Sequence, residues 1–539
     1  MLRVIVFGCG AALMGLEMVA ARVLAPYLGN SIYVWGAVIS VVMIALSLGY
    51  ALGGQIADRF GAARALPPVI AGAALATVAA PPIAAAVLPT ASEFGPRLGS
   101  LAAAAAIYFL PALLLAMVSP MGVKLASSSG IEHIGRSAGN LYAVSTAGSI
   151  AGTLATSFWL IPILSLEPLV VWTGFLLLAL ALAATRVATA DAPGVTPANA
   201  ASESDPGGKR DTGGARAGGA LTVTVTLALA IATTALGGFV LWRVAPAPAE
   251  NALGEAVLFR ADTQYHRITV TEDAEVRHLR FDSSHQSALE IADPYVSRIR
   301  YPDYMHLALA LKPDPERVLV LGLGGGAITK RFWRDYPDVQ VDSVEIDPVV
   351  VDVARRYFWL PEDERLRIFT EDARRYVQRT GETYDIVIVD AYYSDSLPFH
   401  LTTDEFLREV RAVMAPDGVI AYNVISATEG DGSELFRSMY RTAEGVWDDL
   451  WVFPIGIGGD AGAGAAAGAA RRNIIVLASD TRLPESELRA RIADRVGGIV
   501  TIRDFEAMAD DLYTQPVPVA DVPLLTDAHA PVDSLIEVQ

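Results

Sequence analysis

Long apolar runs dominate the first half of the chain, whereas the second half alternates short apolar runs with polar ones. Seven runs of about 18–25 residues are long enough to cross the hydrocarbon core of a bilayer as helices. We therefore predict a membrane bundle of six spans over residues 1–186 and a seventh span over residues 219–243. The runs lie near Val4–Leu24, Ile32–Ala57, Leu66–Leu88, Leu101–Leu125, Ala138–Ile161, Leu169–Thr185 and Ala220–Leu241.

The segment between the sixth and seventh runs, residues 187–218, has a different composition. It lacks hydrophobic periodicity and is rich in Gly, Ala, Ser and Pro. Such a segment buries too little apolar surface to offset the entropy of ordering, which predicts a disordered linker.

After residue 250 the pattern becomes that of a soluble domain. Alternation of apolar and polar residues over Val257–Phe281 predicts a small antiparallel sheet, so we assign residues 250–312 to a β-rich subdomain on the substrate side. Over residues 313–539, short apolar strands alternate with helices, and two later runs add closing strands. This alternation predicts a parallel sheet covered on both faces, a Rossmann-like doubly wound α/β fold.

Composition agrees with this division into a membrane half and a soluble half. Mean hydropathy is +0.39 with 19% charged residues. Residues 1–249 carry a net charge of +3 and residues 250–539 one of −21. The acidic half argues against nucleic acid as a partner, because phosphate binding rests on Lys and Arg. The single cysteine, Cys9, excludes an intrachain disulfide and a cysteine-rich metal site, and we predict no metal.

A glycine-rich segment follows the first predicted strand of the α/β domain and opens a helix. It contains Gly322, Gly324, Gly325 and Gly326, and Ala327 completes the dinucleotide fingerprint G-x-G-x-x-G/A. Missing side chains let a ligand approach the backbone, and the helix N-terminus offers unpaired N–H groups. The segment indicates a nucleotide without specifying which one.

Carboxylates follow the next strands. Glu345 ends the second strand, 18 residues after Ala327, where a carboxylate accepts both hydroxyls of a ribose. Glu371 and Asp372 come just after the third strand, where an acid accepts a hydrogen bond from the exocyclic amine of adenine. An N-cap role for Asp372 on the following helix is an equally simple interpretation, and the two roles are compatible.

Asp390 ends the fourth strand, at the edge of a parallel sheet where ligands bind. A carboxylate there is placed to accept a proton from an attacking amine or to hold a cationic nucleophile. Tyr392 and Asp395 lie on the loop that would close over it.

These four signals, in this order, resemble the spermidine synthase family of aminopropyltransferases, most closely its bacterial membrane-fused branch. The resemblance covers about residues 255–425. It implies that Asp390 takes the proton of an amine attacking decarboxylated S-adenosylmethionine, and that Tyr304 lies next to that amine. It further implies a cofactor site that contains the glycine loop, Gln286, Glu345, Asp347, Glu371 and Asp372.

The chain departs from the family pattern mostly on the acceptor side. Ala327 replaces the Asp of the family's G-G-G-D-G loop, and Asp395 is displaced by two residues from the second Asp of D-S-S-D. The family's Y-Q-x-I and Y-[HQ]-E become Tyr265-His266-Arg267-Ile268 and Tyr304-Met305-His306. We retain as candidate substrate-binding residues Tyr265, His266, His306, Tyr392 and Asp395.

The leading interpretation is a membrane-bound aminopropyltransferase that uses decarboxylated S-adenosylmethionine, or S-adenosylmethionine itself, and a small-molecule amine acceptor. A methyltransferase is the second interpretation, and NAD binding by the same glycine loop is the weakest. A solute or polyamine transporter with a nucleotide-binding regulatory domain is the third, suggested by the ionisable Glu17 and Arg22 within the first span. Residues Gly54–Arg64 also resemble the G-x-x-x-D-R-x-G-x-x-R loop of major facilitator transporters. Association into a homo-oligomer stays open.

Loop charges predict an orientation in the cell membrane. With the N-terminus inside, nine Lys and Arg residues fall in inner segments, and the outer ones carry little beyond Arg97 and Arg243. Seven spans then place residues 250–539 outside, whereas adenosyl cofactors are normally cytoplasmic. One re-entrant run would reverse the assignment, so the side of the soluble domain stays open.

Overall fold

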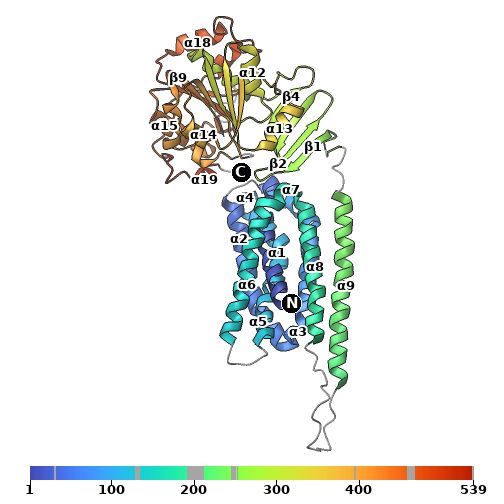
Figure 1. Ribbon diagram of the computed structural model, residues 1–539. Coiled ribbons are helices and arrows are strands. Elements are labelled where there is room, and N and C mark those ends of the chain that lie inside the picture. The colour runs from blue at the N-terminus through green and yellow to red at the C-terminus, as the bar shows by residue number, and fades with distance from the viewer. Residues whose placement is uncertain are drawn as a thin grey trace, which may run out of the picture. The chain divides into compact units, whose positions relative to one another are not determined.

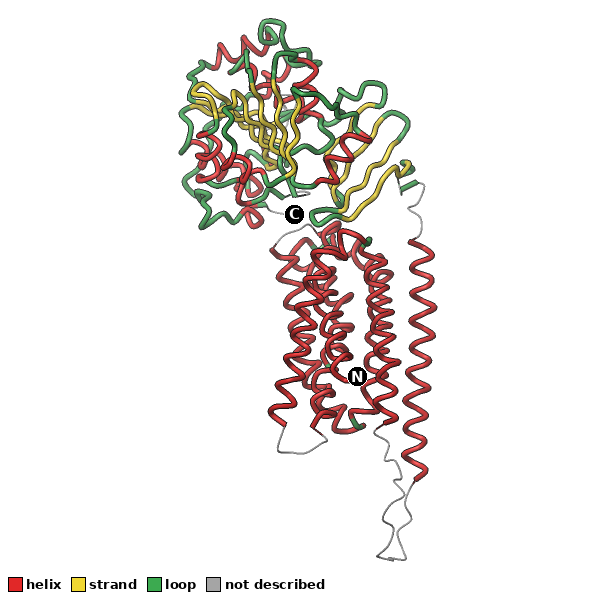
Figure 2. Tube along the Cα trace, in the orientation of Figure 1, coloured by secondary structure: helices red, strands yellow, loops and turns green. Residues whose placement is uncertain are grey.

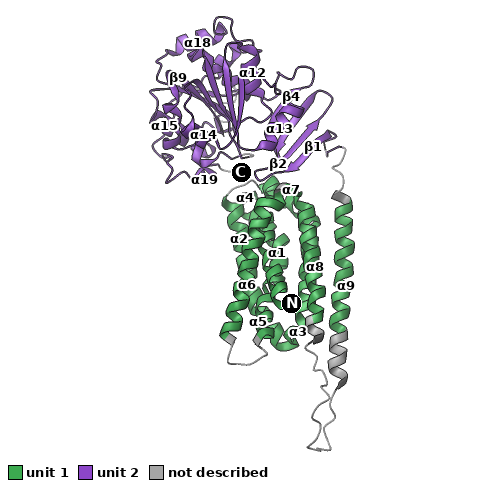
Figure 3. Ribbon diagram, viewed as in Figure 1, with its two compact units in different colours: residues 1–247 green, residues 248–539 purple. Residues whose placement is uncertain are grey.

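The computed structural model describes residues 1–28, 32–127, 134–190, 212–244, 250–251, 253–393, 396–457 and 468–536. The chain divides into two compact units, residues 1–247 and 248–539 (Figure 3). The first unit is helical, and the second contains all the described strands (Figure 2).

The helical unit follows the apolar runs of the sequence (Figure 1). Six helical stretches are long and apolar enough to cross a membrane by length and composition: Leu2–Leu28, Ile32–Phe60, Ala62–Ser92, Arg97–Ala126, Leu166–Arg186 and Leu221–Trp242. The helices are α1 (Leu2–Leu28), α2 (Ile32–Phe60), α3 (Ala62–Ser92), α4 (Gly95–Ala116), α5 (Val118–Ser127), α6 (Ile134–Ala155), α7 (Ile161–Ile163), α8 (Leu166–Ala190) and α9 (Thr212–Val244), with a π-helical turn over Thr156–Leu160.

The predicted span Ala138–Ile161 is not among those six stretches, because α6 is rich in Gly, Ser and Thr. These small residues let α6 pack closely along α1. A Cβ on Gly148 would overlap the carbonyl oxygen of Phe7, and one on Gly152 would overlap that of Ala11. The order of these contacts shows that α6 runs parallel to α1, so close packing between helices accounts for its low hydropathy.

The predicted linker, residues 187–218, lies largely outside the described residues, which resume at Thr212. The last helix of the first unit, α9, begins there, inside the segment predicted to be a linker.

The second unit begins with the predicted small antiparallel sheet. Its strands β1 (Ala256–Asp262), β2 (Arg267–Glu272), β3 (Val276–Phe281) and β4 (Ser284–Glu290) pair in sequence order. The alternation that predicted this sheet appears in β1 as alternating exposed and partly buried positions.

A seven-stranded sheet with the order β10-β11-β9-β8-β5-β6-β7 forms the core of the second unit. Five strands are parallel, while β11 is antiparallel to β9 and to β10. This confirms the doubly wound parallel sheet with closing strands. The strands are β5 (Arg317–Leu321), β6 (Gln340–Glu345), β7 (Leu366–Thr370), β8 (Tyr384–Val389), β9 (Met414–Ser426), β10 (Asp449–Pro454) and β11 (Arg472–Ser479).

Helices pack on both faces of this sheet. Alternate residues of a strand point to opposite faces, so Val320 belongs to one apolar cluster and Leu321 to the other. One cluster receives side chains from α10 (Tyr301–Tyr304), α11 (Ala308–Leu311), α12 (Ala327–Asp335), α13 (Pro348–Tyr357) and α18 (Glu485–Ala493). The other receives them from α14 (Ala373–Arg379), α15 (Asp404–Ala412), α16 (Glu434–Glu444) and α19 (Val532–Leu535).

The boundary predicted at residue 312 differs from the structure. The small sheet ends at Glu290, and residues 304–311 are buried in the core of the large sheet. The apolar run Leu307–Leu311 therefore belongs to the α/β domain. Its burial in the core of the large sheet places α10, which directly precedes it, beside that sheet.

Candidate active site

A pocket of about 760 Å³, including the open space at its mouth, lies at the carboxyl ends of the parallel strands. The chain order reverses at β5, which has β6 on one side and β8 on the other. Strand ends diverge at such a switch point, and the crevice between them is where ligands bind in open α/β sheets. Residues from the small sheet complete its wall: His266, Phe281, Gln286 and Ser287.

The glycine loop fits tightly against its neighbours. Gly322 has φ +104°, and a Cβ there would overlap the carbonyl oxygen of Asp390. The Gly325 N–H donates to the Ser287 hydroxyl at 2.9 Å, and Gly326, with φ +70°, is the N-cap of α12. Only Gly322 and Gly324 line the pocket. Some glycines of this loop are therefore required by its close packing against β4 and the end of β8, and not by a ligand.

Glu345 lines the pocket and is only 7% exposed. Its two carboxylate oxygens accept hydrogen bonds from the N–H groups of Asp347 at 3.0 Å and Leu323 at 3.2 Å. Burial raises the pKa of Glu345 to about 7, although these backbone hydrogen bonds act in the opposite direction. A weakly acidic carboxyl group therefore faces the pocket.

Asp347 does not line the pocket but supports it from behind. One carboxylate oxygen accepts the Val349 N–H at 2.9 Å and caps α13, and the other accepts the Thr263 hydroxyl at 2.5 Å. Asp347 thus connects the β1–β2 turn to the element that positions Glu345.

Glu371 and Asp372 both line the pocket. Asp372 accepts the Arg375 N–H at 3.0 Å, which confirms its N-cap role on α14. Its second oxygen lies 3.0 Å from Nε2 of His400, and this hydrogen bond is the main cause of the lowered pKa of Asp372. His400, which the sequence did not single out, therefore fixes Asp372 in the wall.

Asp390 follows β8 and is held by a chain of amides. Its Oδ1 accepts the Asn423 side-chain N–H at 3.0 Å, and Asn423 in turn accepts from Asn473 at 3.0 Å. The Tyr301 hydroxyl donates to the Gln286 carbonyl at 3.4 Å, and it lies close enough to the Asp390 carboxyl group to lower the pKa of that group. Burial raises the pKa of Asp390 to about 7, against the effect of Asn423 and Tyr301. A carboxyl group with a pKa near neutrality is well suited to proton transfer.

Two predicted residues lie away from the pocket lining. The Tyr304 hydroxyl donates to Asp511 at 2.6 Å, and the His306 ring stacks on Phe332 with centroids 4.1 Å apart. Both side chains are buried, 1% and 0% exposed. Tyr304, which the family resemblance placed beside the reacting amine, is therefore not part of the lining of this pocket. Tyr301, at the start of the one-turn helix α10, takes the place next to Asp390.

The remaining predicted residues divide between lining and support. Gln286, His266 and Tyr392 line the pocket. The His266 ring stacks on Phe281 at 4.4 Å, and the Tyr392 hydroxyl donates to the Asn423 carbonyl at 2.8 Å. Tyr265 does not line the pocket; burial and the nearby carboxylates, Asp347 first, raise the pKa of its phenol. Asp395 lies outside the described residues.

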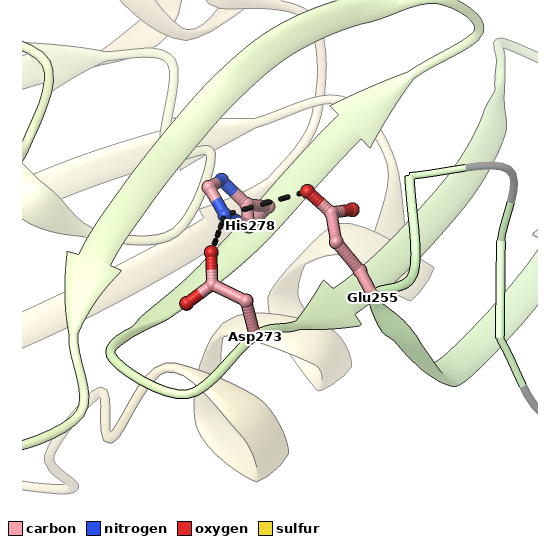
Figure 4. A group of neighbouring side chains, drawn as sticks. All are labelled: Glu255, Asp273 and His278. Atoms are coloured by element: carbon pink, nitrogen blue, oxygen red, sulfur yellow. Dashed lines mark hydrogen bonds and ion pairs between the residues drawn. The ribbon is translucent and has the colours of Figure 1, made fainter.

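Three potential metal ligands meet on the small sheet, away from the pocket (Figure 4). Nε2 of His278 lies 3.3 Å from Asp273 and 3.7 Å from Glu255. The Arg280 guanidinium already bonds Glu255 at 2.9 Å. Burial opposes ionisation of Glu255, but the bonds from Arg280, Thr271 and Asn251 outweigh it and lower its pKa to about 2. An internal cation thus neutralises this carboxylate, and we assign no metal there.

The parallel sheet, the glycine loop and the carboxylates at the strand ends define a Rossmann-like α/β domain with an acidic pocket at its switch point. A Spermine/spermidine synthase domain model matches residues 300–429. The polyamine aminopropyltransferase of Vibrio vulnificus (strain CMCP6) is 34% identical over 208 residues, which cover 37% of this chain and 68% of the Vibrio protein. The chain therefore belongs to the spermine/spermidine synthase family, whose members are transferases.

Other relatives match over shorter lengths. The probable polyamine aminopropyl transferase of Bifidobacterium longum (strain NCC 2705) is 33% identical over 25% of this chain and 29% of its own length. The polyamine aminopropyltransferase of Streptococcus uberis is 35% identical over 26% of this chain and 50% of its own. Among solved structures, spermidine synthase from Thermotoga maritima matches with 19% identity and a TM-score of 0.38, covering 48% of this chain and 84% of that one.

Proposed function

We propose that the second unit transfers an aminopropyl group from decarboxylated S-adenosylmethionine to a small amine, and that the helical unit holds it in a membrane. The observation that carries the proposal is Asp390, with its pKa near 7, at the carboxyl end of β8 in the pocket that also contains Glu345. The family relationship supports the same reaction class.

The pocket charge favours a decarboxylated co-substrate. Among the described residues, its lining contains four carboxylates, Glu345, Glu371, Asp372 and Asp390, and no Lys or Arg. A sulfonium cation with an aminopropyl tail and a protonated amine acceptor both complement this charge. Ordinary S-adenosylmethionine would bring a carboxylate into the same acidic pocket without a strong cationic partner. This disfavours the methyltransferase interpretation.

The reaction follows from these positions. The attacking nitrogen of the acceptor, in its neutral form while the other end of the amine stays protonated, attacks the aminopropyl carbon bonded to sulfur, and the C–S bond breaks with its electron pair retained by sulfur. The products are a neutral thioether, methylthioadenosine, and an ammonium whose proton passes to the Asp390 carboxylate. In this proposal Glu345 accepts the ribose hydroxyls, and Glu371 and Asp372 face the adenine. The protein contributes mainly alignment of the two reactants and removal of the proton.

The product that forms tests the proposal. The purified full chain is incubated with decarboxylated or ordinary S-adenosylmethionine and with a series of linear diamines and polyamines. We expect methylthioadenosine from the decarboxylated nucleotide with at least one amine. Release of S-adenosylhomocysteine from ordinary S-adenosylmethionine would instead support methyl transfer, and absence of methylthioadenosine with every amine would refute the proposal.

The two tyrosines of α10 are expected to respond differently to loss of their hydroxyls. Tyr301→Phe removes the hydroxyl that lowers the pKa of Asp390, so the acidic limb of the kcat–pH profile should move to higher pH. Tyr304→Phe leaves Asp511 with one buried hydrogen bond fewer and should cost about 1–3 kcal/mol of stability. Paired pH profiles and thermal melts measure both. A shifted pH profile for Tyr304→Phe rather than Tyr301→Phe would contradict the assignment.

Membrane placement rests on the helical unit. Its six long apolar stretches carry many exposed large apolar side chains, among them Met43, Ile44, Leu110, Trp172 and Ile231. A water-soluble protein rarely exposes so much contiguous apolar surface, and a bilayer would cover it. Pelleting of the full chain with membranes through an alkaline carbonate wash is the expected result, and release into the supernatant would contradict it.

A further inference from the structure

Glu17 lies near the middle of α1 and is half-buried, at a small cavity among three helices of the first unit that measures about 240 Å³ when the open space at its mouth is included. The rest of the lining is apolar or aromatic: Leu13, Leu16 and Ala20 from α1, Val42 from α2, and Tyr108, Pro111 and Ala112 from α4. An ionisable group at this depth of an apolar helix is costly, and such groups usually bind something.

Within the described part of the chain, the Glu17 carboxyl has no hydrogen bond or ion pair. Tyr108 is 3% exposed, lines the same cavity, and its hydroxyl likewise has no hydrogen bond from any described residue. Two oxygen-bearing side chains without partners among the described residues, Glu17 and Tyr108, therefore line one apolar cavity.

The chemistry of this cavity selects the kind of ligand. A divalent metal requires about six oxygen ligands, and this lining supplies far fewer. An organic ammonium requires one counter-charge, a few acceptors and apolar surface for its alkyl chain. Glu17 provides the charge, the Tyr108 ring and hydroxyl complement the cation, and Leu13, Leu16 and Val42 contact the chain.

We propose that Glu17 and Tyr108 form a second amine-binding site, within the helical unit, for the ammonium end of a linear diamine or polyamine. The choice of polyamines rests on the proposed function, because the acidic pocket of the second unit is expected to use the same class of molecule. The cavity itself is independent of that function. In this proposal one chain has two amine-binding sites, and different residues form each of them.

Equilibrium dialysis of radiolabelled 1,4-diaminobutane against the full chain in detergent tests this site. Glu17→Gln keeps the shape of the side chain and removes its charge, so we expect the bound amine to fall by about one molecule per chain. Glu167→Gln, a matched change at an exposed position in the first turn of α8, should bind as the wild type does. Unchanged stoichiometry and affinity in Glu17→Gln would overturn the proposal.

Two further variants keep the test decisive. Tyr108→Phe removes one oxygen and no bulk, and we expect binding weaker by about 2- to 10-fold. If Glu17→Gln does not elute as a monodisperse protein, an unchanged affinity in Tyr108→Phe overturns the proposal instead. Asp390→Asn separates the two sites, because Glu17-dependent binding should survive it. If the wild-type chain forms no methylthioadenosine with any amine while Glu17-dependent binding persists, this site is supported and the proposed function is rejected.

Discussion

Asp390→Asn is expected to lower kcat by about 10²- to 10⁴-fold, with little change in nucleotide affinity. Asparagine retains an oxygen that accepts the Asn423 N–H now made to Asp390 at 3.0 Å, so the pocket wall stays in place. It has no basic oxygen for the proton released by the amine. Single-turnover formation of methylthioadenosine measures the loss directly, and Asp338→Asn, at an exposed position, is the matched control.

The pH dependence should identify the same group. Because burial raises the pKa of Asp390 to about 7, the wild-type rate falls as the pH drops below 7 and the carboxylate becomes protonated. Asp390→Asn should lack this limb in its residual rate. An Asn variant with wild-type kcat, or one that keeps the limb, would show that another group takes the proton.

The raised pKa of Asp390 also predicts how the stability of the fold depends on pH. The rate falls as the pH drops below 7, whereas stability rises in the same direction. A folded pKa above the unfolded value of about 3.9 means that the native state binds the extra proton between these two values. The stability contributed by the protonated form is complete below about pH 3.9 and is lost as the pH rises through about 7. Asp390→Asn should therefore melt at a higher temperature than wild type at pH 8, and the difference should shrink towards pH 4.

The carboxylates of the site were predictable because their positions follow from strand periodicity alone. Glu345, Asp372 and Asp390 each follow a short apolar run, and parallel strands bring their carboxyl ends to one edge of a sheet. The glycine loop was predictable for the same reason, as it joins the first of those strands to a helix. Local sequence was therefore sufficient to predict that these carboxylates line one pocket.

The partners of Asp390 depend on long-range contacts that local pattern does not contain. Asn423 and Asn473 are polar residues within the apolar strands β9 and β11, and they meet only because β11 inserts antiparallel beside β9. Tyr301 and Tyr304 differ in role because of how one turn of helix is oriented against the sheet. Both tyrosines are visible in the sequence, but the orientation of the turn, which decides what each of them contacts, is not.

The helical unit shows a related limit. Hydropathy identifies helices through surfaces that face lipid, and α6 instead presents glycines to α1. These glycines let the backbones of α6 and α1 approach closely, and mean hydropathy does not detect this kind of packing. Glu17 was visible as an anomaly in an apolar run, but the cavity and Tyr108 around it come from α2 and α4.

Glu345→Gln is expected to weaken nucleotide binding by about 10- to 100-fold, the effect of losing hydrogen bonds to a charged acceptor. The carboxylate accepts two backbone N–H groups and, in the proposed complex, the ribose hydroxyls. An amide presents an N–H₂ group to one of those donors and cannot satisfy both. Glu364→Gln, exposed and outside the pocket lining, is the matched control and should bind normally.

Proton release on binding distinguishes this role from a merely structural one. Burial raises the pKa of Glu345 to about 7, so at pH 6.5 much of the free protein carries a proton there. Ribose hydroxyls donate to the ionised form and lower its pKa, and binding must then release protons. Calorimetry in buffers of different ionisation enthalpy should detect this release at pH 6.5, little of it at pH 9, and less in Glu345→Gln than in the control. Equal release in the two variants would place the nucleotide's hydroxyls on another acceptor.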